Sequence, residues 1–310
     1  MKTVTLNCWE HFRCVAERCR HSCCVGWEIG VDEESLRRYA AVEGEFGRRL
    51  RRSIAVGDEG AFFVLQGEEE RCPFLNGRGL CDMILTLGED SLCDICAEHP
   101  RYRHCFTHRE EVGFGLCCEE AARELLTFPG RLELVALCED GEPTPPPTDW
   151  ERQLLEIRER LLETARDRSR SVYARSEALL RCCGAALPEK SGREWRQVLE
   201  RLERLSGDWD AVLSRLDTAP KGEQSGLAHL SLPLEQLLVG FLYRHLSGAE
   251  DPGGLRGRVA FSVLSFRVLY ALAAAGEGSV EELCELARLY SGEIEYSDEN
   301  LPALLALCAT

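Results

Sequence analysis

The distribution of cysteine constrains this chain more than any other feature of its sequence. The chain has 17 cysteines in 310 residues, and 13 of them lie at or before Cys138. A chain of this length can bury a sizeable apolar core, so it does not need disulfides to compensate for small size. The segment from Met1 to Cys14 has no apolar run followed by small residues, as a secretory signal would have. We therefore expect a cytoplasmic protein whose clustered thiols bind metal or carry out redox chemistry.

Composition and charge exclude several classes of protein. Hydrophobic residues make up 45% of the chain and charged residues 29%, the balance of a folded globular protein. The formal net charge of −16 disfavours nucleic acid as a partner, because an acidic chain gains no counterion release on binding it. The most apolar stretch, 259–275, is interrupted by Arg267 and is better interpreted as a buried helix than as a membrane span. We expect no membrane partner, and the sequence does not indicate an oligomeric state.

A proline-rich segment, 142–149 (EPTPPPTD), divides the sequence. Its prolines exclude a helix and favour an extended linker between a cysteine-rich metal domain, 1–141, and an α-helical domain, 150–310. Thr148 and Glu151 stand at the spacing of a capping box, which predicts a helix from residue 150. The predicted fold class is mainly α: a loop-rich cysteine domain with short strands, whose packing is organised by metal, followed by an α-helical domain.

Apolar residues at helical spacing predict further helices in the second half of the chain. The predicted helices are 195–205, 232–246, 255–275 and 297–307, and Ser279 with Glu282 forms a second capping box before another one. The leucine-rich stripe of 237–246 is interpreted as core rather than as a ligand pocket. In the first half the predicted strands are 27–31 and 61–65, and the predicted helices are 33–42 and 119–127.

Three cysteine clusters carry the chemistry of the first half. The first spans 12–26, the second spans 72–101 and the third spans 116–123. Short spacings let neighbouring thiolates converge on one metal at little loop-closure cost. Cys93 and Cys96 form a CxxC, a spacing shared by zinc sites, iron–sulfur sites and thioredoxin-type motifs. The residues alone leave zinc and iron–sulfur open, because both accept tetrahedral sulfur ligands. Isolated cysteines fit small buried residues instead: Cys8, Cys138, Cys182, Cys183, Cys284 and Cys308.

Several of these motifs resemble the flagellin lysine-N-methylase family. The matching pieces are FRC…C…CCVGWEI (12–29), CPFLN…GLC (72–81), LCDICAEHPR (92–101) and CEEAAR (118–123). Weaker matches follow at LLVGFLYRHL (237–246) and SGEIEYSDENL (291–301). In the last of these, Tyr296 stands where the family pattern has histidine.

The resemblance implies a methyltransferase that uses S-adenosylmethionine to methylate lysine side chains of flagellin, with a [4Fe–4S] cluster, or zinc as the alternative, in the cysteine domain. Cys105 and Cys117 fall outside the matched pattern. Nine thiols exceed the four ligands of one cluster, which leaves two metal centres, or one centre plus structural thiols. The matched metal candidates are Cys14, Cys19, Cys23, Cys24, Cys72, Cys81, Cys93, Cys96 and Cys118.

Two usual signatures of donor binding are absent from the sequence, the GxGxxG after a strand and the CxxxCxxC. The enzyme assignment therefore comes from the resemblance, and two alternatives stay open. One is a non-catalytic zinc or iron–sulfur protein; the other is an iron–sulfur enzyme that acts on another peptide or small molecule. Candidate bases beside the clusters are His21, Glu28, Asp32, His99, Glu119 and Glu120.

Overall fold

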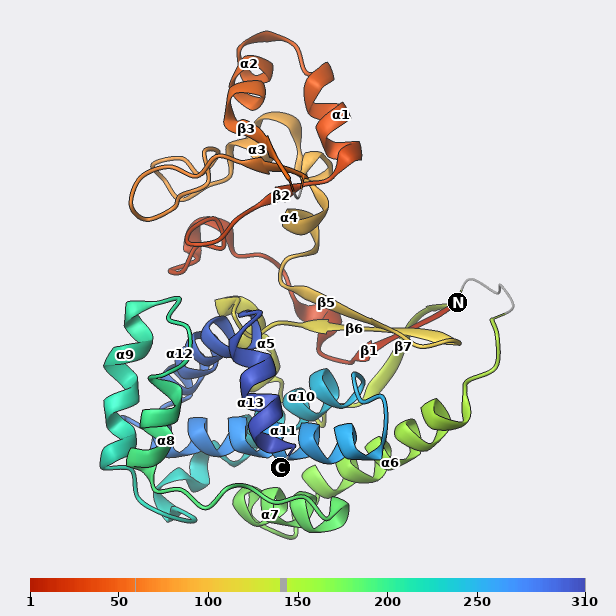
Figure 1. Ribbon diagram of the computed structural model, residues 1–310, viewed down its shortest axis with the longest axis vertical. Helices are drawn as coiled ribbons and strands as arrows, with labels where there is room; N and C mark the ends of the chain where they lie inside the picture. Colours follow the sequence, from red (N-terminus) through yellow and green to blue (C-terminus); the bar gives the residue numbers. More distant parts are fainter. Residues whose placement is uncertain (59, 140–143, 310) are drawn as a thin grey trace. The chain divides into compact units, whose positions relative to one another are not determined.

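The computed structural model describes residues 1–58, 60–139 and 144–309 (Figure 1). It is mainly α-helical with a few short strands, which confirms the predicted fold class. The chain forms two compact units. The helical unit consists of Met1–Phe12 and Tyr102–Thr310, and the cysteine unit consists of Arg13–Arg101.

The compact units differ from the division predicted at the proline-rich segment. Residues 142 and 143 of that segment lie outside the described residues, and residues 144–148 are neither helix nor strand. The difference arises from β1 (Lys2–Leu6), which pairs with strands that come more than a hundred residues later. This long-range pairing joins the start of the chain to the helices.

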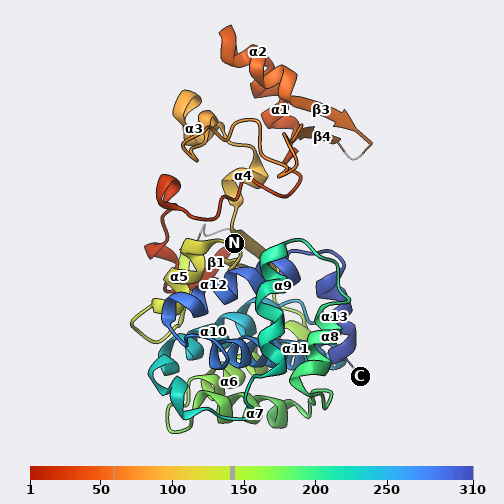
Figure 2. The ribbon, with the colours of Figure 1, turned by 90° about the vertical axis from the view of Figure 1, so that its left-hand side faces the viewer.

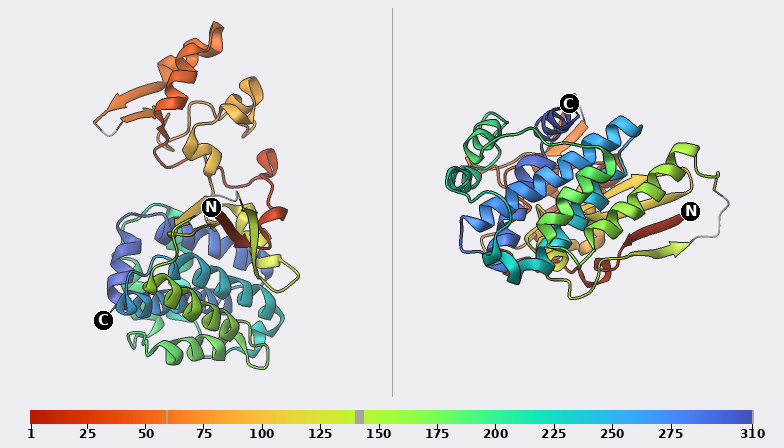
Figure 3. Two further views of the ribbon diagram at one scale, coloured as in Figure 1. Left: turned by 90° about the vertical axis from the view of Figure 1, so that its right-hand side faces the viewer. Right: turned by 90° about the horizontal axis from the view of Figure 1, so that it is seen from below.

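A four-stranded sheet in the order β5-β6-β1-β7 forms one part of the helical unit. Its other strands are β5 (Arg101–Cys105), β6 (Arg109–Phe114) and β7 (Leu134–Glu139). β1 runs parallel to β6 and antiparallel to β7, as the red strand between its yellow and yellow-green neighbours shows (Figure 3). β5 and β6 follow each other in the chain, but the pairing of β1 with β6 and β7 is long-range, and local sequence patterns did not predict it.

Two long helices form the centre of the helical unit (Figure 2). α10 (Ser231–Leu246) and α11 (Pro252–Ala274) are buried along most of their length. α11 is long and apolar enough to cross a membrane, but 78% of its most apolar window is buried inside the protein. This confirms its interpretation as a core helix. The remaining helices of the unit are α5 (Glu119–Thr127), α6 (Asp149–Ala165), α7 (Val172–Cys183), α8 (Gly192–Leu199), α9 (Gly207–Leu213), α12 (Val280–Tyr290) and α13 (Asn300–Cys308).

The helix starts follow the predicted caps. Thr148 and Glu151 form a complete capping box at the start of α6, as predicted. Ser279 caps α12 by accepting a hydrogen bond from the Glu282 amide, but the Glu282 carboxylate accepts from the amide of Gly278. The second box is therefore only half formed.

The predicted helix 195–205 is wrong beyond Leu199, where α8 ends. The backbone amides that would extend it bind side chains from the end of the chain. Asn300 Oδ1 accepts from the amide of Glu203 at 2.8 Å, and Glu293 accepts from the amide of Leu205 at 3.0 Å. These tertiary hydrogen bonds compete with helix formation.

The cysteine unit contains a three-stranded antiparallel sheet in the order β2-β4-β3. Its strands are β2 (Gly30–Val31), β3 (Ile54–Gly57) and β4 (Gly60–Phe63), so the predicted strands 27–31 and 61–65 are present but shorter. Its helices are α1 (Glu33–Ala41), α2 (Gly44–Ser53), α3 (Asp82–Leu87) and α4 (Asp94–Glu98).

An apolar core lies inside the cysteine unit. Phe63 and Phe74 pack edge to face with ring centroids 5.1 Å apart, and Leu50 is fully buried beside them. Cys72 and Cys93 are buried members of the same core. The thiols are therefore set into an apolar core, and the predicted role of metal in organising this packing stays a prediction.

Candidate functional site

Five thiols from the first and second sequence clusters meet in the core of the cysteine unit. We call Cys24, Cys72, Cys81, Cys93 and Cys96 the thiol cluster. The thiols of Cys24 and Cys72 are hydrogen-bonded to each other, as are those of Cys93 and Cys96. Cys96 is close enough to Cys24 and Cys72 for their charges to act on it. The structure thus brings the CxxC together with thiols from much earlier in the chain.

Each hydrogen-bonded pair of thiols favours one thiolate. Hydrogen bonds from Cys23 and then Cys72 lower the pKa of Cys24, and the bond to Cys24 raises the pKa of Cys72. Within the CxxC, the bond from Cys96 lowers the pKa of Cys93, while the pKa of Cys96 is raised. Because the thiolate is the form that binds metal, the cluster is chemically suited to a soft cation or an iron–sulfur cluster.

Helix α1 and the residue before it fix the position of the CxxC. The Asp32 carboxylate accepts hydrogen bonds from the amide of Ser35 at 2.7 Å, which caps α1, and from the amide of Asp94 at 2.9 Å. The hydroxyl of Tyr39 donates to the carbonyl of Ser91 at 2.8 Å. One carboxylate therefore ties the start of α1 to the first residue of α4, directly after Cys93.

A second polar network shapes the loop that carries Cys72 and Cys81. Asn76 Oδ1 accepts from the amides of Arg78 at 2.9 Å and Leu80 at 3.1 Å, and its Nδ2 donates to Asp82 at 2.9 Å. Arg49 on α2 donates to Asp82 at 2.7 Å and to the carbonyl of Pro73 at 2.6 Å. These bonds close the loop at both ends, which is how thiols nine positions apart come to face the same core.

His99 adds a nitrogen to the surroundings of the thiols. Its ring lies 5.9 Å from that of Trp27, and its Nε2 is buried without a hydrogen-bond partner in the part of the chain that the structure describes. Burial lowers the pKa of His99, and the nearby Cys24 opposes that shift. A neutral imidazole with a free buried nitrogen is a donor that a metal could use.

The chemistry of these donors fits a metal, although their arrangement is not that of a finished site. Within residues 1–58, 60–139 and 144–309, no group of three or more His, Cys, Asp or Glu side chains is arranged to hold a metal ion. The support for a metal is the donor set itself: five gathered thiols, two of them with lowered pKa, and the unpartnered His99 nitrogen. The metal assignment remains a prediction.

The other four predicted thiols are not part of the apolar core that holds the thiol cluster. Cys14 is exposed, Cys19 donates to the carbonyl of His21 at 2.9 Å, and Cys23 is exposed while bonding Cys24. Cys118 belongs to the helical unit, where it precedes α5 and packs against Phe12 and Phe114. The structure therefore places eight of the nine matched thiols in the cysteine unit and one in the other unit.

Two predicted bases have structural roles. Asp32 caps α1, and Glu120 forms an ion pair with Arg123 three residues further along α5. Glu28 is exposed, and Glu119 opens α5. Among the predicted bases, His99 combines burial with an unpartnered ring nitrogen.

Sequence reasoning missed Arg244. It lies on the apolar helix α10, between the rings of Tyr102 and Tyr296, with its guanidinium carbon 4.9 Å from each ring centroid. Tyr296 is also hydrogen-bonded to the Cys117 thiol. A signal was present: a charge inside LLVGFLYRHL must find a partner or a ligand when the helix is buried.

Comparison with known proteins gives a few distant relatives. No model of a protein family matches the chain, and no solved structure matches it. The chain is 26% identical over 129 residues, or 40% of its length, to a Lysine-N-methylase of Salmonella choleraesuis. A Lysine-N-methylase of Salmonella typhimurium is 26% identical over 128 residues.

The matches cover different shares of these relatives. The chain spans 32% of the length of each Lysine-N-methylase and 76% of a Flagellar biosynthetic protein FliU of Salmonella muenchen, to which it is also 26% identical. These relatives confirm that the chain resembles, at a distance, the flagellin lysine-N-methylase family.

Proposed function

We propose that this protein takes part in the S-adenosylmethionine-dependent N-methylation of lysine side chains of flagellin, with a metal centre on its thiol cluster. The observation that carries the proposal is the similarity to proteins named Lysine-N-methylase and FliU. The thiol cluster supports its metal part, because it gathers thiols from three of the matched motifs. Because the chain spans 32% of the first relative, activity of the chain alone is part of the proposal.

The thiol cluster and His99 are the residues that would hold the metal. A [4Fe–4S] cluster or a zinc ion there would cross-link the loops that carry the thiols. Methyl transfer itself is a displacement on the sulfonium donor. It requires a neutral lysine amine in line with the methyl group, which positioning and desolvation favour. Such a protein would work in the cytoplasm, where its thiols stay reduced.

One observation favours a second function, a non-catalytic metal-binding protein. Asp32 bonds two backbone amides, and Asn76 closes the loop that carries Cys72 and Cys81. These hydrogen bonds are enough to hold the thiols in place when no substrate is bound. A protein of this kind would bind metal but would not need a methyl donor.

The test is co-expression with flagellin, followed by intact-mass analysis of flagellin and metal analysis of the protein purified without oxygen. The proposal predicts mass gains in units of one methyl group, and iron with matching sulfide, or zinc. Paired replacement of Cys93 and Cys96 by serine is expected to remove the metal. The matched control replaces Cys138 and Cys182, two exposed thiols, and should keep the metal.

Each result separates the two functions. Unmodified flagellin in the presence of metal-loaded protein and donor would exclude the methylase and leave the metal-binding protein. Full metal content and unchanged stability of the Cys93 and Cys96 double variant would show that the metal lies elsewhere.

A further inference from the structure

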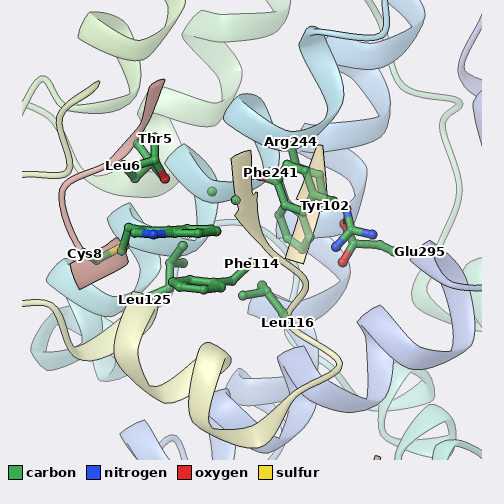
Figure 4. A pocket seen from close by; sticks show the side chains of 13 residues that line it. Thr5, Leu6, Cys8, Tyr102, Phe114, Leu116, Leu125, Phe241, Arg244 and Glu295 are labelled. Atoms are coloured by element: carbon green, nitrogen blue, oxygen red, sulfur yellow. Dashed lines mark ion pairs between the residues drawn. The ribbon is translucent and has the colours of Figure 1, made fainter. Parts of the chain in front are cut away.

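A narrow pocket lies inside the helical unit. The cavity is small, about 10 Å³ in volume, so a ligand larger than water has to displace lining side chains when it enters. Figure 4 shows Arg244 and Glu295 together at one side of the pocket, with Cys8 and Leu6 on the opposite side. The pocket is lined by residues of β1, β5, β6, α5, α10 and the π-helical turn η6 (Ser291–Glu295).

Most of the pocket wall is apolar and aromatic. The rings of Trp9 and Phe114 stack with centroids 4.5 Å apart, and Phe241 and Leu125 also line the pocket. Such a wall suits the apolar part of a small molecule, and a thioether or sulfonium packs well against aromatic rings. The few polar groups of the pocket then decide how a ligand is oriented.

Two charged side chains at one side of this pocket keep an unpaired atom each. Arg244 Nε lies 3.3 Å from Glu295 Oε1, which also bonds His245 Nε2 at 2.6 Å. Arg244 Nη1 and Glu295 Oε2 are buried and make no hydrogen bond of normal geometry among the residues that the structure describes, although the Ser291 hydroxyl lies near the Glu295 carboxylate. Burying a donor and an acceptor of charged groups without partners is costly, so a ligand that pairs with both would be favoured.

The charges at this side of the pocket balance without a ligand. Burial would raise the pKa of Glu295, but Arg244 and then His245 outweigh it and lower that pKa. Burial lowers the pKa of His245, so the imidazole is neutral beside one cation and one anion. Burial also raises the pKa of the neighbouring Tyr296 and Cys117 well above neutrality, which leaves both uncharged. A ligand with one net charge would bury an uncompensated charge in the pocket, whereas a zwitterion would add no net charge.

The backbone at Glu295 is also unusual. Ser291–Glu295 is a π-helical turn, closed by a hydrogen bond from the amide of Tyr296 to the carbonyl of Ser291 at 3.2 Å. π-turns inserted after an α-helix occur often at functional sites, because they redirect a side chain. Here the turn follows α12 and ends on the carboxylate that lines the pocket.

We propose that this pocket binds the zwitterionic α-amino-acid group of a small molecule, with its carboxylate on Arg244 Nη1 and its ammonium on Glu295 Oε2. The apolar remainder of the ligand packs against Phe114 and Phe241. If the proposed function holds, this ligand is the methionine end of the methyl donor, and that identification rests on the proposed function. The binding of an α-amino-acid group by the pocket does not depend on it.

The first experiment is calorimetric titration of the whole protein with a set of related ligands. S-adenosylhomocysteine and L-methionine carry the α-amino-acid group. Methylthioadenosine lacks it, and decarboxylated and deaminated methionine each lack one of the two charges. We expect each truncated ligand to bind about tenfold more weakly or worse than its parent, because one buried charged atom stays unpaired. Equal affinity of parent and truncated ligands, or no binding of any of them, would overturn the proposal.

Variants test the two named residues. Arg244→Gln and Glu295→Gln are expected to weaken S-adenosylhomocysteine by about tenfold or more and to leave methylthioadenosine unchanged. The matched control is Arg258→Gln, since Arg258 bonds the carbonyl of His245 at 3.2 Å but does not line the pocket. Binding of S-adenosylhomocysteine to folded Arg244→Gln with wild-type affinity would contradict the proposal. If these variants fail to fold, the ligand series on the wild-type protein decides.

Failure of this inference differs from failure of the proposed function. Binding of L-methionine without binding of S-adenosylhomocysteine would support the amino-acid pocket and exclude it as the donor site. Methylated flagellin together with unchanged ligand binding by the Arg244 variant would support the function and overturn the pocket assignment.

Discussion

Arg158 and Glu111 form a buried, bidentate ion pair in the helical unit. Arg158 Nη1 and Nη2 donate to the two carboxylate oxygens of Glu111 at 2.5 and 2.6 Å, and the side chains are 1% and 2% exposed. Ser247 completes the network by donating to Glu111 at 3.0 Å and accepting from Arg158 at 2.6 Å. The pair links α6 to β6, and Ser247 adds the end of α10.

Glu111→Ala is expected to destabilise the protein by about 3–5 kcal/mol, because it leaves the buried Arg158 guanidinium without its counterion. Urea unfolding measures the change in the free energy of unfolding. The control is Arg181→Ala, which removes an exposed ion pair with Glu177 and should cost about 0.5 kcal/mol or less. Similar losses in the two variants would show that the Arg158 pair does not stabilise the native state.

The same pair makes stability depend on pH. Burial would raise the pKa of Glu111, but Arg158 outweighs burial and holds the folded-state pKa below its ordinary value of 4.5. As the pH falls below 4.5, the unfolded chain takes up this proton before the native state does. The contribution of Glu111 is therefore fully present near neutral pH and is lost as the pH falls through its folded-state pKa.

Glu111→Gln provides the measurement for this dependence. The variant is expected to be less stable than the wild type at pH 7, with a difference that shrinks as the solution is acidified. The free energy of unfolding of both proteins is compared over that range. A difference that stays constant or grows on acidification would contradict the assigned direction of the pKa shift.

Local patterns in the sequence predicted the helix starts well. The capping box at Thr148 is complete, because it depends on residues three apart. The four-stranded sheet was missed because β1 pairs Lys2 with Arg109 and Glu139, partners that no local pattern connects. Helix 195–205 was predicted too long because its last amides bind Glu293 and Asn300, which lie far along the chain.

The candidate sites show the same limit. Cysteine spacing identified the thiols, but not that Cys24, Cys72 and Cys96 share one core. Arg244 and Glu295 were not predicted as a pair, because their proximity depends on α10 and η6 packing together. Spacing shows which residue types are available, and packing decides which of them meet.

Asp32→Ala is expected to lower both stability and metal content. The variant loses the hydrogen bonds to the amides of Ser35 and Asp94, which should cost about 1–2 kcal/mol and loosen the segment that carries Cys93. Thermal unfolding and metal analysis of the same sample provide the two readouts. The control, Glu34→Ala, changes an exposed residue in the first turn of α1 and should keep the metal. Full metal content in Asp32→Ala would show that the thiols do not need this carboxylate in order to bind metal.

Asn76→Ala tests the loop between Cys72 and Cys81. The substitution removes the acceptor for the amides of Arg78 and Leu80 and the donor to Asp82, so we expect a loss of about 1–3 kcal/mol and a lower metal content. Arg78→Ala is the matched control, because only the backbone amide of Arg78 bonds Asn76.

The comparison of these two variants decides whether the loop serves the thiols. A lower metal content in Asn76→Ala, with Arg78→Ala unchanged, is expected if the closed loop holds Cys72 and Cys81 toward the other thiols. If Asn76→Ala loses stability and keeps all of its metal, the loop is a structural element of the cysteine unit and these two thiols do not bind the metal.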